Sequence, residues 1–283
     1  MNRNKILLVN NIEDTGIVTQ YTYTGSTSIL PTFTPEDYNY TVSDVSNSDG
    51  STTRTIYSVD FVYPTKCVLS SKFITSIDYY KLSETETIDM TRAFYSCYNV
   101  VNINLSRLNT SNCASFTEMC KDCRNVINLD LSNFDMSNAQ MLNGMLSGCS
   151  KLQTVNASGW GQLPKVIKAH YMFSSCSSLT RIYGTNTWVL PMNTNASNMF
   201  YGDSSLSILD LSSCTMANCN SAFNMLYNCT RLTQLKLNNS VIKSNCNVTN
   251  MMYNVQSSCV VTVPSNFGKT EYDCKFGGTF TVV

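Results

Sequence analysis

The sequence predicts an α/β repeat solenoid of the leucine-rich-repeat type, built from parallel strands and short helices and preceded by a small β-rich N-terminal domain. Cysteines recur at an almost constant interval, at Cys97, Cys123, Cys149, Cys176 and Cys229. Between them, apolar residues repeat first with a helical spacing and then with the period of two that is typical of a strand. We number each unit from its cysteine, which is position 0.

Each unit is expected to contain a helix of about three turns, because apolar residues at positions −7, −4, −3, 0 and +3 share one helix face. The unit of Cys149 shows the pattern with Leu142, Met145, Leu146 and Leu152. In this arrangement the cysteine is a small, buried side chain that packs against neighbouring units. We therefore expect the repeat cysteines to stack in a buried column.

The array is expected to span residues 67–263 in about eight coils. The interval from Cys176 to Cys229 holds two units if Asp203 takes position 0 in the unit between them. One step back from Cys97 reaches Ser71, and one step beyond Cys229 reaches Gln256.

A short strand with one buried face should follow each helix, since Leu129 and Leu131 alternate with Asn128 and Asp130. Stacking the units side by side buries the apolar faces and makes these strands parallel. They are expected near residues 77–79, 103–105, 129–131, 155–157, 182–184, 209–211 and 235–237.

The unit "LDLSNFDMSN…MLNGMLSGCSKL" resembles the 26-residue leucine-rich repeat of the BspA-like bacterial surface-protein family. The resemblance covers about two-thirds of the chain. Members of that family are mostly secreted or cell-surface adhesion and binding proteins, and similar repeats occur in protozoan and phage proteins. The resemblance therefore implies a solenoid that binds a partner.

The two ends of the chain do not carry the repeat. Residues 1–66 include "GIVTQYTYTG" and "TIYSVDFVYP", which alternate as strands do, with a turn at 47–52. We expect them to form an attachment domain or a cap. Residues 264–283 should form a β cap, with a hairpin at Gly277 and Gly278.

The composition limits the classes of binding partner that can be expected. The chain has 19 basic and 19 acidic residues, so neither nucleic acid nor an anionic membrane is an expected partner. The N-terminal apolar run covers only Ile6 to Val9, too short for a secretory signal, and no segment is long enough to span a membrane. These features predict folding in the cytoplasm, with the 13 cysteines reduced.

Catalytic, cofactor and metal sites are not predicted. Cys120 and Cys123 form a single CxxC pair, but both fall at core positions of the expected helix. His170 is the only histidine, and no nucleophile motif accompanies it. An enzyme that uses His170 is therefore a remote alternative.

A binding surface is expected on the outward side of the strands, where polar residues alternate with the buried ones. Irregular loops add aromatic residues, which are favoured at interfaces. The predicted partner-binding residues are Asn102, Asn104, Asn128, Asp130, Asn156, Arg181, Tyr183, Trp188, Gln234 and Lys236. For Trp188, the sequence favours a place on this surface and a place in the core about equally.

These observations favour a non-enzymatic structural or binding protein. The first hypothesis is a virion component, such as a phage fibre, tail or capsid-decoration protein, that folds in the host cytoplasm. It would contact other virion proteins through residues 1–66 and present the repeats to a protein or glycan ligand. The alternative is a bacterial or protozoan adhesin at the cell surface.

Overall fold

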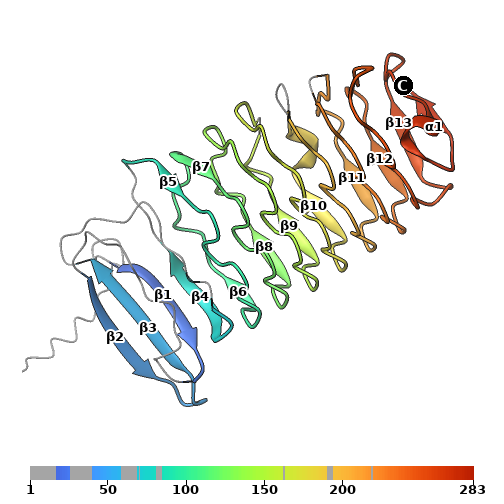
Figure 1. The fold of residues 1–283 in the computed structure, drawn as a ribbon. Helices are drawn as coiled ribbons and strands as arrows, with labels where there is room; N and C mark the ends of the chain where they lie inside the picture. Colours follow the sequence, from blue (N-terminus) through green and yellow to red (C-terminus); the bar gives the residue numbers. More distant parts are fainter. Residues whose placement is uncertain are drawn as a thin grey trace, which may run out of the picture.

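The computed structural model describes residues 17–25, 40–58, 69, 71–80, 85–161, 163–189, 194–217 and 219–283. The coils stack along one axis into an elongated solenoid (Figure 1). In the part that the structure describes, the helices are the single-turn α1 (Glu271–Cys274) and the 3₁₀ turn η3 (Thr185–Thr187). The predicted repeat solenoid is confirmed, whereas the predicted α/β architecture with a helix in every unit is wrong.

One side of the solenoid is made of short parallel strands, as predicted. Neighbouring coils pair in register, so that Leu129 lies beside Val155 and Val155 beside Ile182. These central residues are buried, and most of the predicted spans begin one residue too late. The strands are β4 (Ile74–Tyr80), β6 (Asn102–Ile103), β8 (Asn128–Asp130), β9 (Thr154–Asn156), β10 (Arg181–Tyr183), β11 (Ile208–Asp210), β12 (Gln234–Lys236) and β13 (Val260–Val263).

The segment that was predicted to be helical is a ladder of β-turns. Backbone N–H groups at positions −5, −3 and −1 donate to carbonyls of the next coil, as Phe94 donates to Met119 at 2.8 Å. Those at positions −4, −2 and 0 donate to the carbonyl three residues earlier, as Cys97 donates to Phe94 at 3.3 Å. An α-helix would direct each of these N–H groups to its own segment and leave none for the next coil.

The turn ladder requires a left-handed backbone at two positions of each coil. The residues at positions −5 and −1 have positive φ, for example 63° at Gly144 and 76° at Gly148. Each stands third in a four-residue turn, where positive φ is the mark of type II geometry and favours Gly or Asn. Gly or Asn occupies these positions at Gly144, Gly148, Asn198, Gly202, Asn224, Asn228, Asn250 and Asn254.

Parallel bridges form a further side of the coils. Strands β5 (Ile88–Asp89) and β7 (Cys113–Ser115) pair in parallel, and single bridges continue from Ser115–Met141 to Ser221–Asn247. The apolar core lies between this side, the turn ladder and the strands β6 to β13. It continues from coil to coil as one cluster of buried residues.

The repeat cysteines form a buried column, as predicted, and none is more than 1% exposed. Each thiol donates to a backbone carbonyl of the preceding coil at 3.0–3.2 Å. The pairs are Cys97 to Leu69, Cys123 to Phe94, Cys149 to Cys120, Cys176 to Leu146 and Cys229 to Phe200. A small side chain that is also a weak donor suits this position.

The predicted position 0 of the last full coil is wrong by one residue. Val255 fills it, 5% exposed, and its N–H donates to Met252 as that of Cys229 donates to Leu226. Gln256 is half-buried beside it, and its side-chain amide donates to the carbonyl of Leu232 at 2.8 Å. The coil from Cys229 to Val255 therefore has 26 residues, and Val260 pairs with Gln234 at the same interval, so the backbone register between coils is kept.

The N-terminal strands extend the sheet of the solenoid. They are β1 (Ile17–Tyr23), β2 (Tyr40–Ser46) and β3 (Thr52–Ser58), in the order β2-β3-β1-β4-β6. Strand β4 pairs antiparallel with β1 and parallel with β6, so it joins the two kinds of sheet. The turn predicted at 47–52 connects β2 to β3, where Asn47 donates to Ser51 at 2.8 Å.

The C-terminal residues form a shortened coil, and the predicted hairpin is wrong. Strand β14 (Phe280–Val282) pairs parallel with β13. Helix α1 precedes it and is held by a capping box between Thr270 and Asp273. Two antiparallel strands at Gly277 and Gly278 would have broken the parallel stacking that the preceding coils impose.

The close approach of neighbouring coils predicts a strong effect at Gly159. A Cβ added there would lie 1.8 Å from the carbonyl oxygen of Ser132 in the preceding coil. We expect Gly159→Ala to lower the free energy of unfolding by about 3 kcal/mol, at the upper end of overpacking effects. Urea denaturation measures the loss. The exposed neighbour offers a control, Ser158→Ala, which should stay within about 0.5 kcal/mol of wild type. Equal losses in both would contradict the packing.

Asp203 interrupts the cysteine column at position 0 with a fully buried acid. Its Oδ1 accepts a hydrogen bond from the Cys176 N–H at 2.9 Å, while Oδ2 has no partner among the described residues. Burial raises the pKa of this carboxyl well above its usual range. The folded chain therefore favours the protonated acid.

This burial predicts that stability declines as the pH rises. Above the ordinary pKa of 3.8, the folded chain keeps a proton that the unfolded chain releases, so unfolding becomes easier. We expect Asp203→Cys to restore the column and to raise the free energy of unfolding at about pH 8 by about 1–3 kcal/mol. The gain should shrink toward about pH 4. Urea denaturation across this range tests it, and a gain that does not depend on pH would contradict the assignment.

Candidate functional site

The outward side chains of β6 and β8 to β12 form a surface that we call the outer sheet surface. Nine of the predicted partner-binding residues lie on it. Asn102, Asn104, Asn128, Asp130, Arg181 and Tyr183 are exposed, and Asn156, Gln234 and Lys236 are half-buried. Because the strands are parallel and in register, these side chains form two rows that run from coil to coil.

Contacts along these rows hold several side chains in place. Thr154 donates to Asn128 at 2.6 Å, and Lys236 forms an ion pair with Asp210 at 3.0 Å. The guanidinium of Arg181 lies over the ring of Tyr183, 5.0 Å from its centroid. The rows therefore present both hydrogen-bonding groups and one exposed aromatic ring.

The row at the strand ends also has a structural role. Asn104, Asp130 and Asn156 each accept a hydrogen bond from the backbone N–H two residues later, at 3.0–3.2 Å. Hydrogen bonds from Ser132 lower the pKa of Asp130. These side chains close the turn that leaves the strand, so only part of their polar groups can serve a ligand.

Trp188 does not belong to the outer sheet surface, and its inclusion among the partner-binding residues is corrected. The residue is fully buried. Its ring stacks on Trp160 at 5.3 Å and on Phe173 at 6.2 Å between centroids. These large aromatic rings fill the core where the turns of this part of the chain are irregular.

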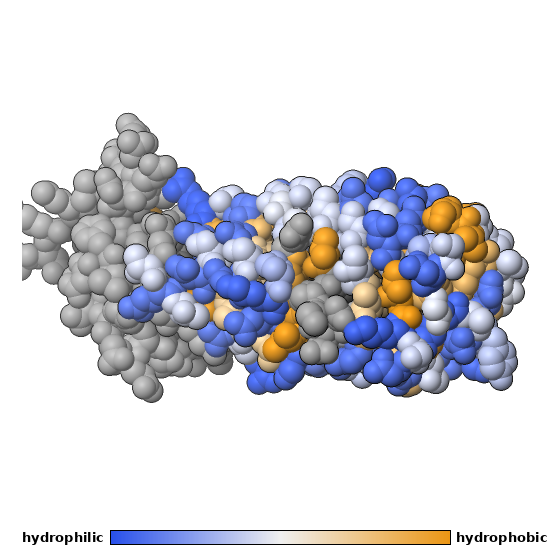
Figure 2. Space-filling model, turned by 90° about the horizontal axis from the view of Figure 1, so that it is seen from above, coloured by the Kyte–Doolittle hydropathy of each residue, from blue (hydrophilic) through white to orange (hydrophobic). Residues whose placement is uncertain are grey.

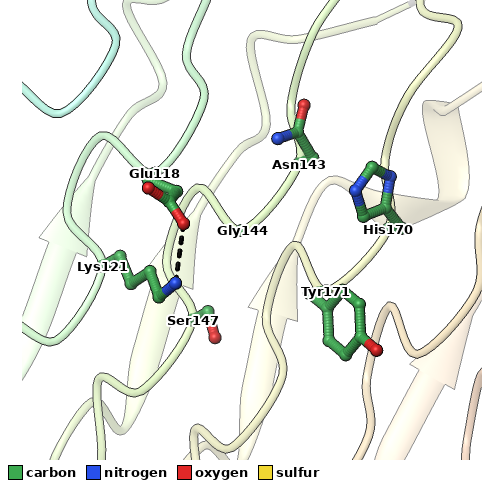
Figure 3. Close-up of a pocket in the computed structure, with 7 residues that line it drawn as sticks. All are labelled: Glu118, Lys121, Asn143, Gly144, Ser147, His170 and Tyr171. Carbon is green, nitrogen blue, oxygen red and sulfur yellow. Dashed lines mark hydrogen bonds and ion pairs between the residues drawn. The ribbon is translucent and has the colours of Figure 1, made fainter.

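A second candidate site is a pocket of 220 Å³ on the turn ladder, which lies on another side of each coil. Gly144 forms its floor. The side chains of Glu118 and Lys121 lie on one side of this glycine, and those of His170 and Tyr171 lie on the other (Figure 3). Asn143 and Ser147, from the same coil as Gly144, complete the lining.

The charged wall of this pocket is internally paired. Glu118 accepts hydrogen bonds from Lys121 at 2.6 Å and from Arg92 at 2.7 Å. Burial opposes ionisation of Glu118, but the two cations outweigh it and lower the pKa of the carboxyl. The wall therefore holds one carboxylate between two cations.

His170 and Tyr171 form the opposite wall. Their rings meet edge to face, with centroids 5.8 Å apart, and Tyr171 is 47% exposed. Burial, followed by the charge of Lys168, lowers the pKa of His170, which favours the neutral imidazole. Its Nδ1 is buried and has no hydrogen-bond partner in the described part of the chain.

The cysteines serve packing. Cys120 and Cys123 are buried, and the Cys123 thiol is used in its hydrogen bond to Phe94. Among the described residues, no group of three or more His, Cys, Asp or Glu side chains is arranged to hold a metal ion.

Residues 69–188 and 182–262 match the family described as "Mycoplasma protein of unknown function, DUF285". The chain belongs to the DUF285 family. The matched stretches cover the stacked coils from Leu69 to β13. No curated protein and no solved structure matches the chain. The described part of this DUF285 protein contains no helix with the length and apolar character of a membrane span.

The pocket in this DUF285 protein was not among the features predicted from the sequence. The signal was present at position −5, where Glu118, Gly144 and Tyr171 follow one another in successive coils. A glycine between two large side chains leaves a gap only if all three point outward. The helical interpretation did not indicate such a gap, because a helix has no left-handed residues that would set position −5 apart from the positions beside it.

The turn-closing role of Asp130 can be separated from ligand binding. We expect Asp130→Ala to lower the free energy of unfolding by about 1 kcal/mol, since the Ser132 N–H loses its acceptor. Because the pKa of Asp130 is lowered in the folded chain, this contribution is present above the ordinary value of 3.8 and is lost as the pH falls. Thermal unfolding at two pH values measures it. Asn102→Ala, on the same surface, should change stability by less than about 0.5 kcal/mol.

Proposed function

We propose that this DUF285 protein is a non-enzymatic structural and binding protein that recognises a protein or glycan through its outer sheet surface. The observation that carries the proposal is the register of the strands. It places outward residues of successive coils, such as Asn128, Thr154 and Arg181, side by side in one row. Solenoids use extended surfaces of this kind to contact partners.

The surface chemistry supports polar recognition. On the one face of the coils that Figure 2 shows, hydrophilic residues predominate and apolar residues occur in separate patches. Tyr183 is 45% exposed and carries Arg181 against its ring. Tyr and Arg are the residue types that contribute most binding energy in protein interfaces.

The setting that we propose is a virion, as part of a phage fibre, tail or capsid decoration. The support is the state of the cysteines. The 12 described cysteines are free thiols and all are buried. Unpaired thiols in such numbers suit a chain that folds in a reducing cytoplasm, where virion components are made.

We place the contact with other virion proteins on the N-terminal strands. Residues 41–46 of β2 are exposed, including Val42 at 54% and Val45 at 59%. Among the strands that the structure describes, β2 ends the order β2-β3-β1-β4-β6, and another chain can add to such an edge by strand pairing.

An adhesin at a bacterial cell surface is the second candidate. The family description names Mycoplasma proteins, which fits the bacterial source of this candidate but states no function. The resemblance to BspA-like repeats points in the same direction. In that setting the outer sheet surface would bind the ligand in the same way.

The binding surface is tested with the full chain and two matched triple variants. Asn128→Ala, Arg181→Ala and Tyr183→Ala remove groups from the outer sheet surface. Asn239→Ala, Arg231→Ala and Tyr272→Ala remove the same residue types from exposed positions elsewhere. Labelled protein is applied to a glycan array and to intact bacterial and animal cells. We expect the first triple to weaken binding at least about tenfold and the second to leave it unchanged.

Wild-type binding by the first triple would overturn the proposed surface. The setting is tested with an antibody against the full chain, applied to purified phage particles and to washed bacterial cells. Labelled particles would support the virion component. Labelled cells with unlabelled particles would overturn it in favour of the adhesin.

A further inference from the structure

Tyr171 adopts the left-handed backbone conformation that Gly or Asn holds at position −5 in four of the seven coils. At position −5 its φ is 57°, in the left-handed region that is sterically costly for a large side chain. The preceding coil has Gly144 at this position, and the next two coils have Asn198 and Asn224. Arg92 and Glu118 also hold large side chains in this conformation at position −5, and two of these three strained residues, Glu118 and Tyr171, line one pocket. Backbone strain that persists in a folded chain tends to gather at functional sites.

The strained tyrosine lines a gap beside Gly144. Gly144 has no side chain, so the column at position −5 is interrupted between Glu118 and Tyr171. Ser147 is also small, and with Asn143 it leaves a pocket of 220 Å³ between the two walls (Figure 3). This volume lies below the roughly 300–1,000 Å³ of pockets for drug-sized ligands, so it suits a single small group.

The walls favour a neutral ligand with several hydroxyl groups. Glu118 is already paired with both Lys121 and Arg92, so a charged ligand would have to compete with formed ion pairs. A hydroxyl donates and accepts, and it can bond to the carboxylate and the ammonium together without separating them. Asn143 accepts from Thr117 at 3.2 Å, which leaves its amide N–H groups for a ligand.

The opposite wall supplies an apolar surface. The ring of Tyr171 is half-exposed, and the neutral His170 meets it edge to face. A pyranose ring has hydroxyls at its rim and C–H groups on its faces, so it matches a site with an aromatic ring on one side and paired polar groups on the other.

We propose that the pocket between Glu118 and Tyr171 binds one neutral sugar residue, with its hydroxyls toward Glu118, Lys121 and Asn143 and a C–H face toward Tyr171. This site lies on the turn ladder. It is therefore independent of the function proposed for the outer sheet surface, and either can fail without the other.

His170 makes the test direct, because a chain with one histidine gives one set of imidazole NMR signals. The full-length protein is titrated with the methyl glycosides of glucose, galactose, mannose and N-acetylglucosamine. We expect at least one of them to shift the His170 signal saturably, with a dissociation constant on the order of 1 mM.

Two variants separate binding from folding. Gly144→Asn fills the pocket with a residue that the same column accepts at Asn198 and Asn224, and it should weaken binding at least about tenfold. Its control is Gly202→Asn. Gly202 also has a left-handed backbone but lies outside the pocket, so this variant should bind as wild type. Tyr171→Asn should lose binding while its Tm stays equal or rises, because the strain is relieved.

Three results would overturn the proposal. One is the absence of a saturable shift with all four glycosides. Another is wild-type affinity in Gly144→Asn, which would place binding elsewhere. The third is binding of glucuronate about tenfold tighter than of methyl glucoside, which would show that the Glu118–Lys121 pair opens for an anion.

Discussion

The hydrogen bonds that join one coil to the next through the turn ladder determine most of this structure. Every second N–H in the ladder points along the solenoid axis and must find a carbonyl directly opposite it in the following coil. This requirement keeps the coil length nearly constant and places positions −5 and −1 in the left-handed region. It also keeps equivalent side chains of successive coils adjacent, as the stacked rings of Tyr201, Tyr227 and Tyr253 show.

The same constraint explains why the interior consists of columns of similar residues. A side chain at position 0 packs against the position 0 side chains of the preceding and the following coil. The same kind of neighbour therefore limits its size and polarity in every coil. Cysteine meets both limits, because it is small and its thiol reaches the carbonyl of the preceding coil, as in Cys149 to Cys120 at 3.1 Å. Burial raises the pKa of the Cys176 and Cys229 thiols on either side of Asp203, which disfavours their thiolate forms.

The sequence was sufficient to predict the period, the buried columns and the parallel strands, since each follows from the spacing of apolar residues. It did not distinguish the helix from the turn ladder, because both place positions −7, −4, −3, 0 and +3 inward. The distinction lay in glycines and asparagines such as Gly144 and Gly148, four residues apart, which a helix would not favour. The inward place of Trp188 and the pocket at Gly144 depended on that backbone, so the spacing alone did not reveal them.

A repeating solenoid can carry two kinds of recognition, and this chain shows the geometry for both. Polar residues repeated in register on the outer sheet surface suit a partner that extends over several coils. A single departure from the repeat, such as Tyr171 opposite Gly144, suits a ligand that fits within one coil spacing. The departure is the more informative feature, because the ladder imposes the repeat on every coil for structural reasons. Glu118 and Tyr171 both place a large side chain at a left-handed position and both line the pocket at Gly144, which is why we propose binding as the reason for these two residues.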